Sequence, residues 1–156
     1  MLKYISFNVS KILDVVCGEG GFVSMIKSLR NVEVWGLDIC EQAAEIAKTK
    51  LDKVIADDIE NMHIVLPQNY FDCVIFNDVL EHFRYPWLVL EKIRTALKDN
   101  GMIIASIPNI RYFEILDDLV RNGEWKYEDE GVLDKTHLRF FTKNSIMGMF
   151  RLCGYE

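Results

Sequence analysis

An apolar run that leads into a glycine-rich turn constrains this chain more than any other feature. Residues 12–16 are apolar except for Asp14, and Gly18 and Gly20 follow at once. Such a run is typical of a strand that is covered on both faces of a parallel sheet. Residues 22–29 then carry apolar side chains at helical spacing, and glycine lets a backbone approach a ligand closely. The segment therefore predicts a strand, a ligand-binding turn and a helix in succession.

Strand and helix patterns alternate along the rest of the chain. Further strands are expected at residues 32–37, 54–56, 71–76 and 102–107, and helices at residues 42–51, from Pro86 to a turn at Asn100 and Gly101, and after an N-cap at Thr142. Five strands separated by helices predict an α/β fold with a doubly wound, mostly parallel sheet and right-handed crossovers. The chain has 156 residues, so we expect a single domain over residues 1–156.

Charge and composition exclude several classes of protein. The formal net charge is −6, whereas a chain that grips a phosphate backbone usually carries a basic stripe, so nucleic acid is not expected as the main partner. No apolar run reaches the ~18 residues that a membrane span needs, and the N-terminus lacks the features of a signal peptide. The four cysteines form no Cys-x-x-Cys pair. This usage indicates reduced thiols and a cytoplasmic protein.

Acidic residues stand where the expected strands end. Asp38 closes the second strand, Asp58 follows the third and Asp78 follows the fourth. Ligands bind at the carboxyl ends of strands in such sheets, and an acid after the second strand can accept hydrogen bonds from ribose hydroxyls. The nicotinamide fingerprint Gly-x-Gly-x-x-Gly does not fit, because Val23 occupies its third glycine position. The pattern therefore predicts a nucleoside-containing cofactor of another kind.

The order Asp-x-x-x-Gly-x-Gly, from Asp14 to Gly20, resembles that of class I S-adenosylmethionine-dependent methyltransferases. The acid at Asp38 and residues 56–60, 71–82 and 97–109 resemble later blocks of the same family in the same order, so the resemblance covers roughly residues 11–109. It implies a Rossmann-like core and S-adenosylmethionine as the cofactor, with the family's C-terminal β-hairpin expected to be missing. By this resemblance the cofactor-binding residues are Asp14, Cys17, Gly18, Gly20, Asp38, Ile39, Asp58, Ile59 and Asn77.

The expected site suits the chemistry of that cofactor. Backbone groups of the glycine turn and the helix N-terminus near Gly21 can bind its ammonium and carboxylate groups, and the strand-end acids suit its sulfonium cation. Val16 departs from the family, which usually has glycine at this position. A branched side chain disfavours any positive φ, so either the turn relaxes to fit the valine or the cofactor binds more weakly.

Two histidines are available for acceptor chemistry. His137 lies in residues 133–142, a block that resembles one in the methyltransferases found alongside glycosyltransferases and in ubiquinone-pathway O-methyltransferases. The resemblance implies that His137 faces a small hydroxylated acceptor, such as a sugar or glycolipid precursor, and acts as general base. It also implies a lid over the active site at about residues 109–141. The arginine and aromatic side chains of this segment could line an acceptor pocket or pack a helix against the lid itself: Arg111, Tyr112, Phe113, Trp125 and Tyr127. Alternatively, His137 caps the last helix or anchors the lid.

Two further alternatives remain open. The main interpretation assigns no metal, but Asp78, Glu81, His82 and His137 could hold a divalent ion, and small-RNA 2′-O-methyltransferases resemble this set in their Glu-His cluster. The chain could instead be a non-catalytic domain that keeps the fold for binding or scaffolding, as Val16 indicates. Without a final hairpin the fifth strand would have an exposed edge, so we expect a second copy or a partner chain to cover it.

Overall fold

The structure is a computed structural model that describes residues 1–61 and 63–156. Its parallel sheet has the strand order β3-β2-β1-β4-β5, with β1 at Lys11–Val15, β2 at Glu33–Asp38, β3 at Lys53–Ala56, β4 at Phe71–Asn77 and β5 at Leu97–Ser106. The helices are α1 (Gly21–Leu29), α2 (Glu41–Ala47), α3 (Pro86–Ala96), α4 (Phe113–Asn122) and α5 (Lys143–Leu152), and 3-10 turns lie at Leu2–Tyr4 and Leu80–His82. The predicted α/β fold with a parallel sheet is confirmed.

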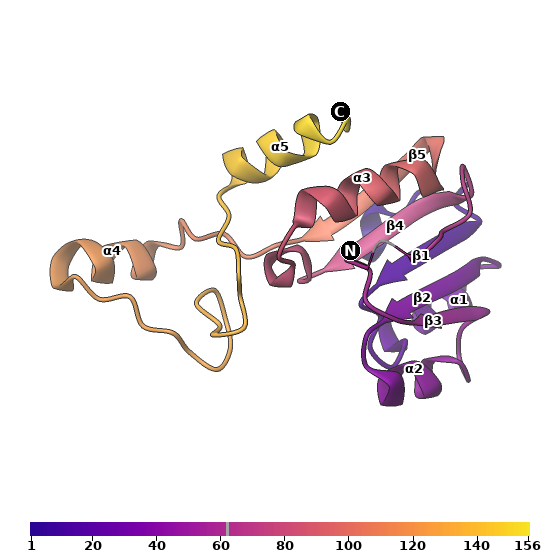
Figure 1. The fold of residues 1–156 in the computed structure, drawn as a ribbon, viewed down its shortest axis with the longest axis horizontal. Coiled ribbons are helices and arrows are strands. Elements are labelled where there is room, and N and C mark those ends of the chain that lie inside the picture. The colour runs from indigo at the N-terminus through magenta and orange to yellow at the C-terminus, as the bar shows by residue number, and fades with distance from the viewer. Residues whose placement is uncertain (62) are drawn as a thin grey trace.

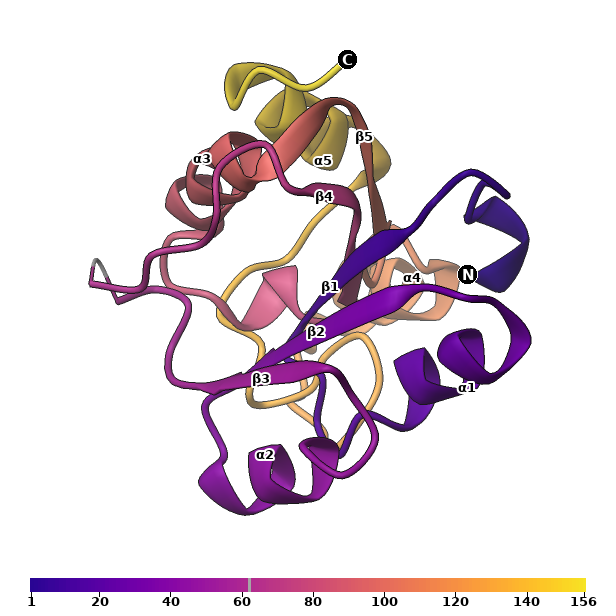
Figure 2. The same cartoon turned by 90° about the vertical axis from the view of Figure 1, so that its right-hand side faces the viewer.

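Helices cover both faces of the sheet, as Figure 2 shows. Ile26 of α1 packs with Ile12 in one apolar cluster, which also includes Ala47 of α2. Ile93 of α3 packs with Phe76 in the other cluster, to which α5 also contributes. Because the sheet is buried on both faces, its strands read as nearly continuous apolar runs in the sequence.

The boundary between α3 and β5 differs from the prediction. The sequence placed the end of this helix at Asn100 and Gly101, but the helix ends at Ala96 and these two residues lie within β5. Leu97 has extended backbone angles and pairs with Phe71, where its side chain is buried. The register of β5 against β4 shifts between Phe71 and Cys73, which pair with Leu97 and Met102. Asn100 and Gly101 lie in this irregular part of β5, which is why the sequence pattern there resembles a turn.

The other helix predictions are partly confirmed. The helix expected at residues 42–51 ends at Ala47, because Leu51 leaves the helix and packs against the backbone of Gly20 and Gly36. Thr142 is the N-cap of α5, as predicted: its hydroxyl accepts from the Ser145 N–H at 3.2 Å in a capping box. Among the described residues no helix is both long enough and apolar enough to cross a membrane.

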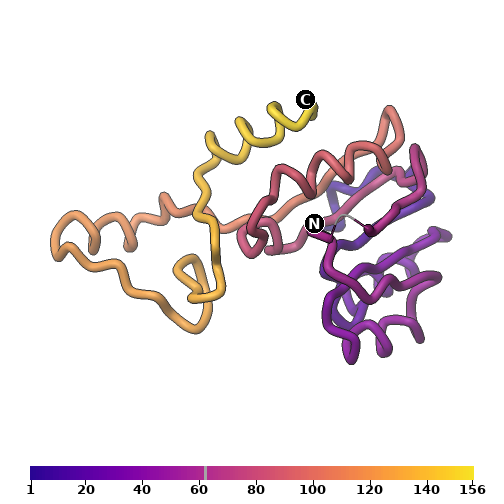
Figure 3. The backbone as a smooth tube through the Cα atoms, in the orientation of Figure 1, coloured from indigo at the N-terminus to yellow at the C-terminus, as the bar shows by residue number. Residues whose placement is uncertain are grey.

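Residues 109–141, called the arm below, leave the body at the carboxyl end of β5 (Figures 1 and 3). Helix α4 lies at the far end of the arm, away from the sheet. The two ends of the arm meet where the Ile110 N–H donates to the Phe141 carbonyl at 2.8 Å. Over residues 1–61 and 63–156 no strand follows β5, so β5 is an edge of the sheet.

Candidate active site

The turn after β1 forms one wall of the site. Val16, Gly18 and Gly20 have positive φ angles of 60°, 54° and 74°. The Cys17 N–H donates to the carbonyl of Leu37 at 3.0 Å, which ties the turn to β2. Helix α1 begins directly after Gly20, so its N-terminus faces the turn, as the sequence predicted.

Val16 lies outside β1, although the sequence placed it in the strand. Its side chain is 40% exposed and lines a cleft. Positive φ in a β-branched residue is a genuine outlier and costs on the order of 1–2 kcal/mol. The turn therefore keeps its positive φ despite the valine, and Val16 lines the cleft.

Two carboxyl groups meet beneath the turn. The Asp38 carboxylate accepts from the Gly18 N–H at 2.7 Å and from the Cys40 N–H at 2.8 Å, and the residue is almost fully buried. Asp14 is buried in the neighbouring strand, and this burial, together with the charge of Asp38, raises the pKa of Asp14 to about 7. A cation bound nearby would favour the ionised form of Asp14.

A cleft of about 710 Å³ opens at the carboxyl ends of the strands. Of the predicted cofactor residues, Ile39 and Asp58 line it directly. The turn residues and Asp38 lie beside it, Ile59 is buried, and Asn77 is exposed at the end of β4. The opposite wall holds residues of the predicted acceptor side, Asp78 and His82. The remaining lining residues were not singled out from the sequence: Glu60, Asn61, Val79, Phe83, Arg84, Tyr85 and Leu138.

Glu60 is the most informative of these additions. Its carboxylate accepts from the N–H groups of Arg84 and Tyr85 at 3.2 and 2.7 Å. It therefore joins the loop after β3 to the loop before α3 across the cleft. No local pattern in the sequence signals this contact, because the partners are more than twenty positions apart.

Glu81, His82 and His137 form a compact cluster at the base of the arm. Their possible ligand atoms all lie within 4.8 Å of one another. Glu81 is 1% exposed, and among the described residues neither carboxylate oxygen has a hydrogen-bond partner. The His137 Nε2 atom is 4.0 Å from Glu81 Oε1. Burial raises the pKa of Glu81 to about 7.

Both histidines are oriented by carbonyl oxygens. His137 Nδ1 lies 3.1 Å from the Val132 carbonyl, and His82 Nδ1 lies 3.3 Å from the Thr136 carbonyl. A carbonyl can only accept, so in the neutral rings each Nδ1 carries the hydrogen and each Nε2 has the lone pair. The Thr136 hydroxyl, 3.2 Å from His82 Nδ1, fits this tautomer because it donates to Asp134 Oδ1 at 2.6 Å. His137 is almost fully buried and does not line the cleft, whereas His82 does.

The arm is fixed to the body through the backbone of Glu81. The N–H groups of Leu138 and Arg139 both donate to its carbonyl, at 2.9 and 3.0 Å. Trp125 and Tyr127 were expected to line an acceptor pocket, but they are not part of the cleft lining. Both pack on Phe140: the ring centroid of Trp125 lies 5.3 Å from that of Phe140, and the ring centroid of Tyr127 lies 6.2 Å from it.

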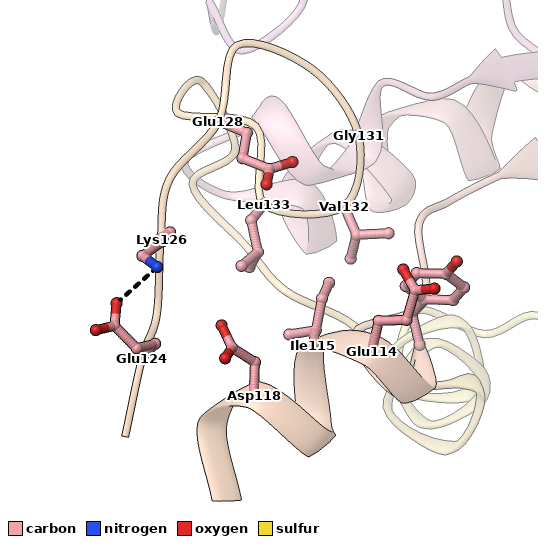
Figure 4. Close-up of a pocket in the computed structure, with 10 residues that line it drawn as sticks. Glu114, Ile115, Asp118, Glu124, Lys126, Glu128, Gly131, Val132 and Leu133 are labelled. Carbon is pink, nitrogen blue, oxygen red and sulfur yellow. Dashed lines mark ion pairs between the residues drawn. The ribbon is translucent and has the colours of Figure 1, made fainter. Parts of the chain in front are cut away.

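A second cavity, of about 440 Å³, lies within the arm between α4 and the loop that follows it (Figure 4). Ile115 and Asp118 of α4 face Val132 and Leu133 of the loop across it. None of the predicted catalytic or cofactor residues lines this cavity.

Comparison with known proteins decides the family. A family model described as a methyltransferase domain matches residues 2–156. This chain belongs to that family. The membership indicates S-adenosylmethionine as the cofactor of this methyltransferase domain, as the sequence motifs predicted.

Relatives of the methyltransferase domain agree with this assignment. The ubiquinone biosynthesis O-methyltransferase of Glaesserella parasuis is 25% identical over 108 residues, which cover 64% of this chain and 45% of that protein. The chain thus spans less than half the length of that relative.

Solved structures show the same fold. The SAM-dependent methyltransferase of Archaeoglobus fulgidus has a TM-score of 0.73 at 22% identity, over 96% of this chain and 62% of that one. The plantazolicin methyltransferase BpumL, solved with a pentazolic desmethylPZN analog and SAH, has a TM-score of 0.71 at 22% identity, over 97% and 57%.

Proposed function

We propose that this chain transfers the methyl group of S-adenosylmethionine to the oxygen of a small hydroxylated acceptor, such as a sugar or glycolipid precursor. The proposal rests on the finding that residues of the cofactor motifs and of the predicted acceptor side line the same cleft at the strand ends. Ile39 and Asp58, from the cofactor motifs, line one part of it, and Asp78 and His82 line another. The similarity to ubiquinone biosynthesis O-methyltransferases supports an oxygen acceptor.

The cofactor would lie along the carboxyl ends of β1, β2 and the loop after β3. The Gly18 and Cys40 N–H groups already hold the Asp38 carboxylate in place, and each of its oxygens keeps further acceptor capacity for a ribose hydroxyl. The N-terminus of α1 and the turn would receive the methionine carboxylate. Asp58 and Ile59 would border the adenine.

His137 is the proposed general base. Its Nδ1 donates to a carbonyl, which leaves Nε2 to take the proton of the acceptor hydroxyl while the oxygen attacks the methyl carbon. This role requires the acceptor to reach past His82, because His82 lines the cleft and His137 does not. The methyl–sulfur bond breaks, and its electron pair leaves on sulfur as a neutral thioether. Glu81, 4.0 Å from Nε2, would stabilise the imidazolium that forms. In the same proposal residues 109–141 act as a lid that excludes water.

A metal-assisted form of the reaction is a second candidate, favoured by the buried carboxylate of Glu81 that lacks a partner. Metal-binding histidines usually donate their other ring N–H to a carbonyl or carboxylate, and both His82 and His137 do so. One carboxylate and two imidazoles suit a divalent transition metal or zinc, with Asp78 nearby on the cleft wall. A bound ion would lower the pKa of an acceptor hydroxyl.

Metal titration separates these two forms. If the cluster holds an ion, zinc or manganese should raise the melting temperature of the parent chain but not of Glu81→Gln, and a chelator should remove both this shift and the activity. If neither metal changes the melting temperature and chelated protein keeps full turnover, the metal-assisted form is wrong.

The third candidate is a domain that keeps the fold without catalysis. Val16 supports it, because a valine with a positive φ lines the cleft where the family usually has glycine. Cofactor binding without turnover on a broad panel of hydroxylated acceptors would favour this alternative.

Calorimetric titration with S-adenosylmethionine tests the main proposal. Asp38→Ala should weaken binding by about 1.5–3 kcal/mol, the usual loss for a hydrogen bond to a charged group. Asp52→Ala is a matched control, because the Asp52 carboxylate also accepts a backbone N–H, that of Val34 at 2.8 Å, but does not line the cleft. Circular dichroism checks that both variants fold. Unchanged affinity in Asp38→Ala would mean that the cofactor binds elsewhere.

We also propose that a second copy or a partner chain covers the edge of β5, where backbone donors and acceptors face outward. Hydrogen exchange along Leu97–Ser106 tests this idea. Amides at this edge should gain protection as the concentration of the chain or its partner rises, and constant rapid exchange would contradict it.

A further inference from the structure

We propose that Glu60 is a positioning residue for the cofactor. It fixes the loop after β3 to the start of α3 and thereby orients the Asp58 carboxylate towards the adenine. This inference rests on the proposed function, because it takes the adenine to lie at Asp58 and Ile59. It gives a role in cofactor binding to a residue that the sequence motifs did not single out.

The side chain of Glu60 is anchored at the beginning of a helix that lacks an acid of its own there. Helix α3 has no side-chain hydrogen bond at its N-cap, Tyr85, and no acidic residue in its first turn. The Glu60 carboxylate accepts from the N–H groups of Arg84 and Tyr85 at 3.2 and 2.7 Å. A negative charge is favourable at a helix N-terminus. The start of α3 therefore holds the Glu60 side chain in a defined place.

The backbone of Glu60 holds Asp58. The Glu60 N–H donates to Asp58 Oδ1 at 2.9 Å, and the Asn61 N–H donates to the Asp58 carbonyl at 2.9 Å. Within residues 1–61 and 63–156 no group donates to the second carboxylate oxygen, Oδ2. Because Asp58 lines the cleft, this oxygen is available to accept from the adenine amino group. Displacement of Glu60 would therefore turn the Asp58 carboxylate.

Lys92 of α3 holds the same loop at a second point. Its ammonium group donates to the carbonyls of Ile59 and Asn61 at 2.8 and 2.6 Å. The side chains of Glu60 and Lys92 thus join residues 59–61 to one helix and its N-terminal end. Binding costs less when the groups that contact a ligand are already ordered. Removal of either set of contacts should therefore lower the affinity for adenosine.

Calorimetric titration with 5′-methylthioadenosine tests the proposal. This probe keeps the adenine and ribose but is uncharged, so it excludes direct attraction between Glu60 and the sulfonium of S-adenosylmethionine. Glu60→Gln leaves one of the two N–H groups without an acceptor, and it should bind the probe about threefold to tenfold more weakly than the parent, the loss expected for one ordinary hydrogen bond. Glu91→Gln is the matched control, because Glu91 is an exposed acid of α3 that does not line the cleft. It should bind the probe like the parent.

Lys92→Met separates positioning of the loop from stabilisation of α3. It removes the contacts to the two loop carbonyls but leaves the start of the helix unchanged. It should also bind the probe about threefold or more weakly. Circular dichroism checks that all variants are folded at the temperature of the titration. Unchanged affinity for the probe in Glu60→Gln would overturn the proposal, even if S-adenosylmethionine binds more weakly, because Glu60 would then act by its charge. Unchanged affinity in Lys92→Met would also overturn it.

Titration of Asp38→Ala with the same probe distinguishes this inference from the proposed function. If Asp38→Ala binds the probe more weakly but Glu60→Gln does not, the cofactor lies at the strand ends and only the positioning role is wrong. If the parent does not bind the probe, or if neither variant differs from the parent, the proposed cofactor site is wrong as well.

Discussion

The body of the sheet and the arm both carry apolar residues at regular spacing, but only the body buries them. In β4, Val74, Ile75 and Phe76 are fully buried between helices, whereas α4 in the arm leaves Phe113 and Val120 largely exposed. Periodicity therefore predicts that an element forms, but it does not predict what covers that element. In the body the cover comes from neighbouring elements of the same chain. In the arm, Phe113 and Val120 of α4 have no such cover among the described residues.

The candidate active site also has one part built by the body and one part built where the arm meets the body. The proposed cofactor wall consists of turns held by backbone hydrogen bonds, such as the one from Gly18 to the buried Asp38 carboxylate. The proposed acceptor wall depends on where the arm meets the body, at Glu81 and His137. A change in the arm should therefore affect the acceptor more than the cofactor.

The largest expected difference between the two regions is in the free energy of unfolding. Phe76→Ala should cost about 3–5 kcal/mol, because it leaves a cavity between two packed layers. Phe113→Ala, at low protein concentration, should stay within about 0.5 kcal/mol of the parent, as exposed substitutions usually do. Urea unfolding followed by circular dichroism measures both changes. Comparable losses would show that the arm packs on the body in solution.

The sequence predicts the body better than the site for a physical reason. The strand, turn and helix from Lys11 to Leu29 and the cap at Thr142 are encoded by residues close together in the chain. The contact between Glu81 and His137 joins positions 56 apart, so no local pattern shows it. Leu97 was misassigned to a helix because its pairing with Phe71 overrides its local sequence. For Val16 the sequence left two outcomes open, a relaxed turn or weaker cofactor binding. The turn keeps a positive φ, because its tertiary contacts outweigh the preference of valine.

A second comparison concerns two glycines and should give a smaller effect. A Cβ atom on Gly36 would lie 2.5 Å from Cys17 Sγ and 2.8 Å from Leu51 Cδ1, whereas one on Gly123 at the end of α4 would meet no atom within 4 Å. Gly36→Ala should destabilise the protein by about 1–3 kcal/mol through overpacking. It should also weaken cofactor binding, since Cys17 belongs to the turn.

Gly123→Ala is the control for Gly36→Ala. Its φ of 69° limits the cost to about 1 kcal/mol of backbone strain, and cofactor affinity should not change. Thermal unfolding and calorimetric titration measure the two properties. Unchanged affinity in Gly36→Ala would show that the turn tolerates displacement of Cys17.

Val16→Gly should change the free energy of unfolding by less than Gly36→Ala does, and it should stabilise the fold rather than destabilise it. Relief of the positive φ should stabilise the fold by up to about 1 kcal/mol after the entropy cost of glycine is subtracted. It should also tighten binding of S-adenosylmethionine, since Val16 lines the cleft. Asn69→Gly is the matched control: Asn69 also has a positive φ, of 49°, but asparagine tolerates this region and the residue is remote from the cleft. Equal affinities of Val16→Gly and the parent would mean that the valine does not impede the cofactor.

The smallest change in the free energy of unfolding is expected from Asp14→Asn at acidic pH, because there an amide replaces a protonated carboxyl of the same shape. In the folded chain burial and then Asp38 raise the pKa of Asp14 from 3.8 to about 7, so between these values the folded state binds more protons than the unfolded state. The free energy of unfolding should therefore fall as pH rises from about 4 to about 7 and then level off. In Asp14→Asn this fall should be shallower, with Glu81 supplying what remains, because the pKa of Glu81 is also about 7. Urea unfolding at a series of pH values measures the slopes. A variant that loses stability as steeply as the parent would show that Asp14 is already ionised in the folded protein.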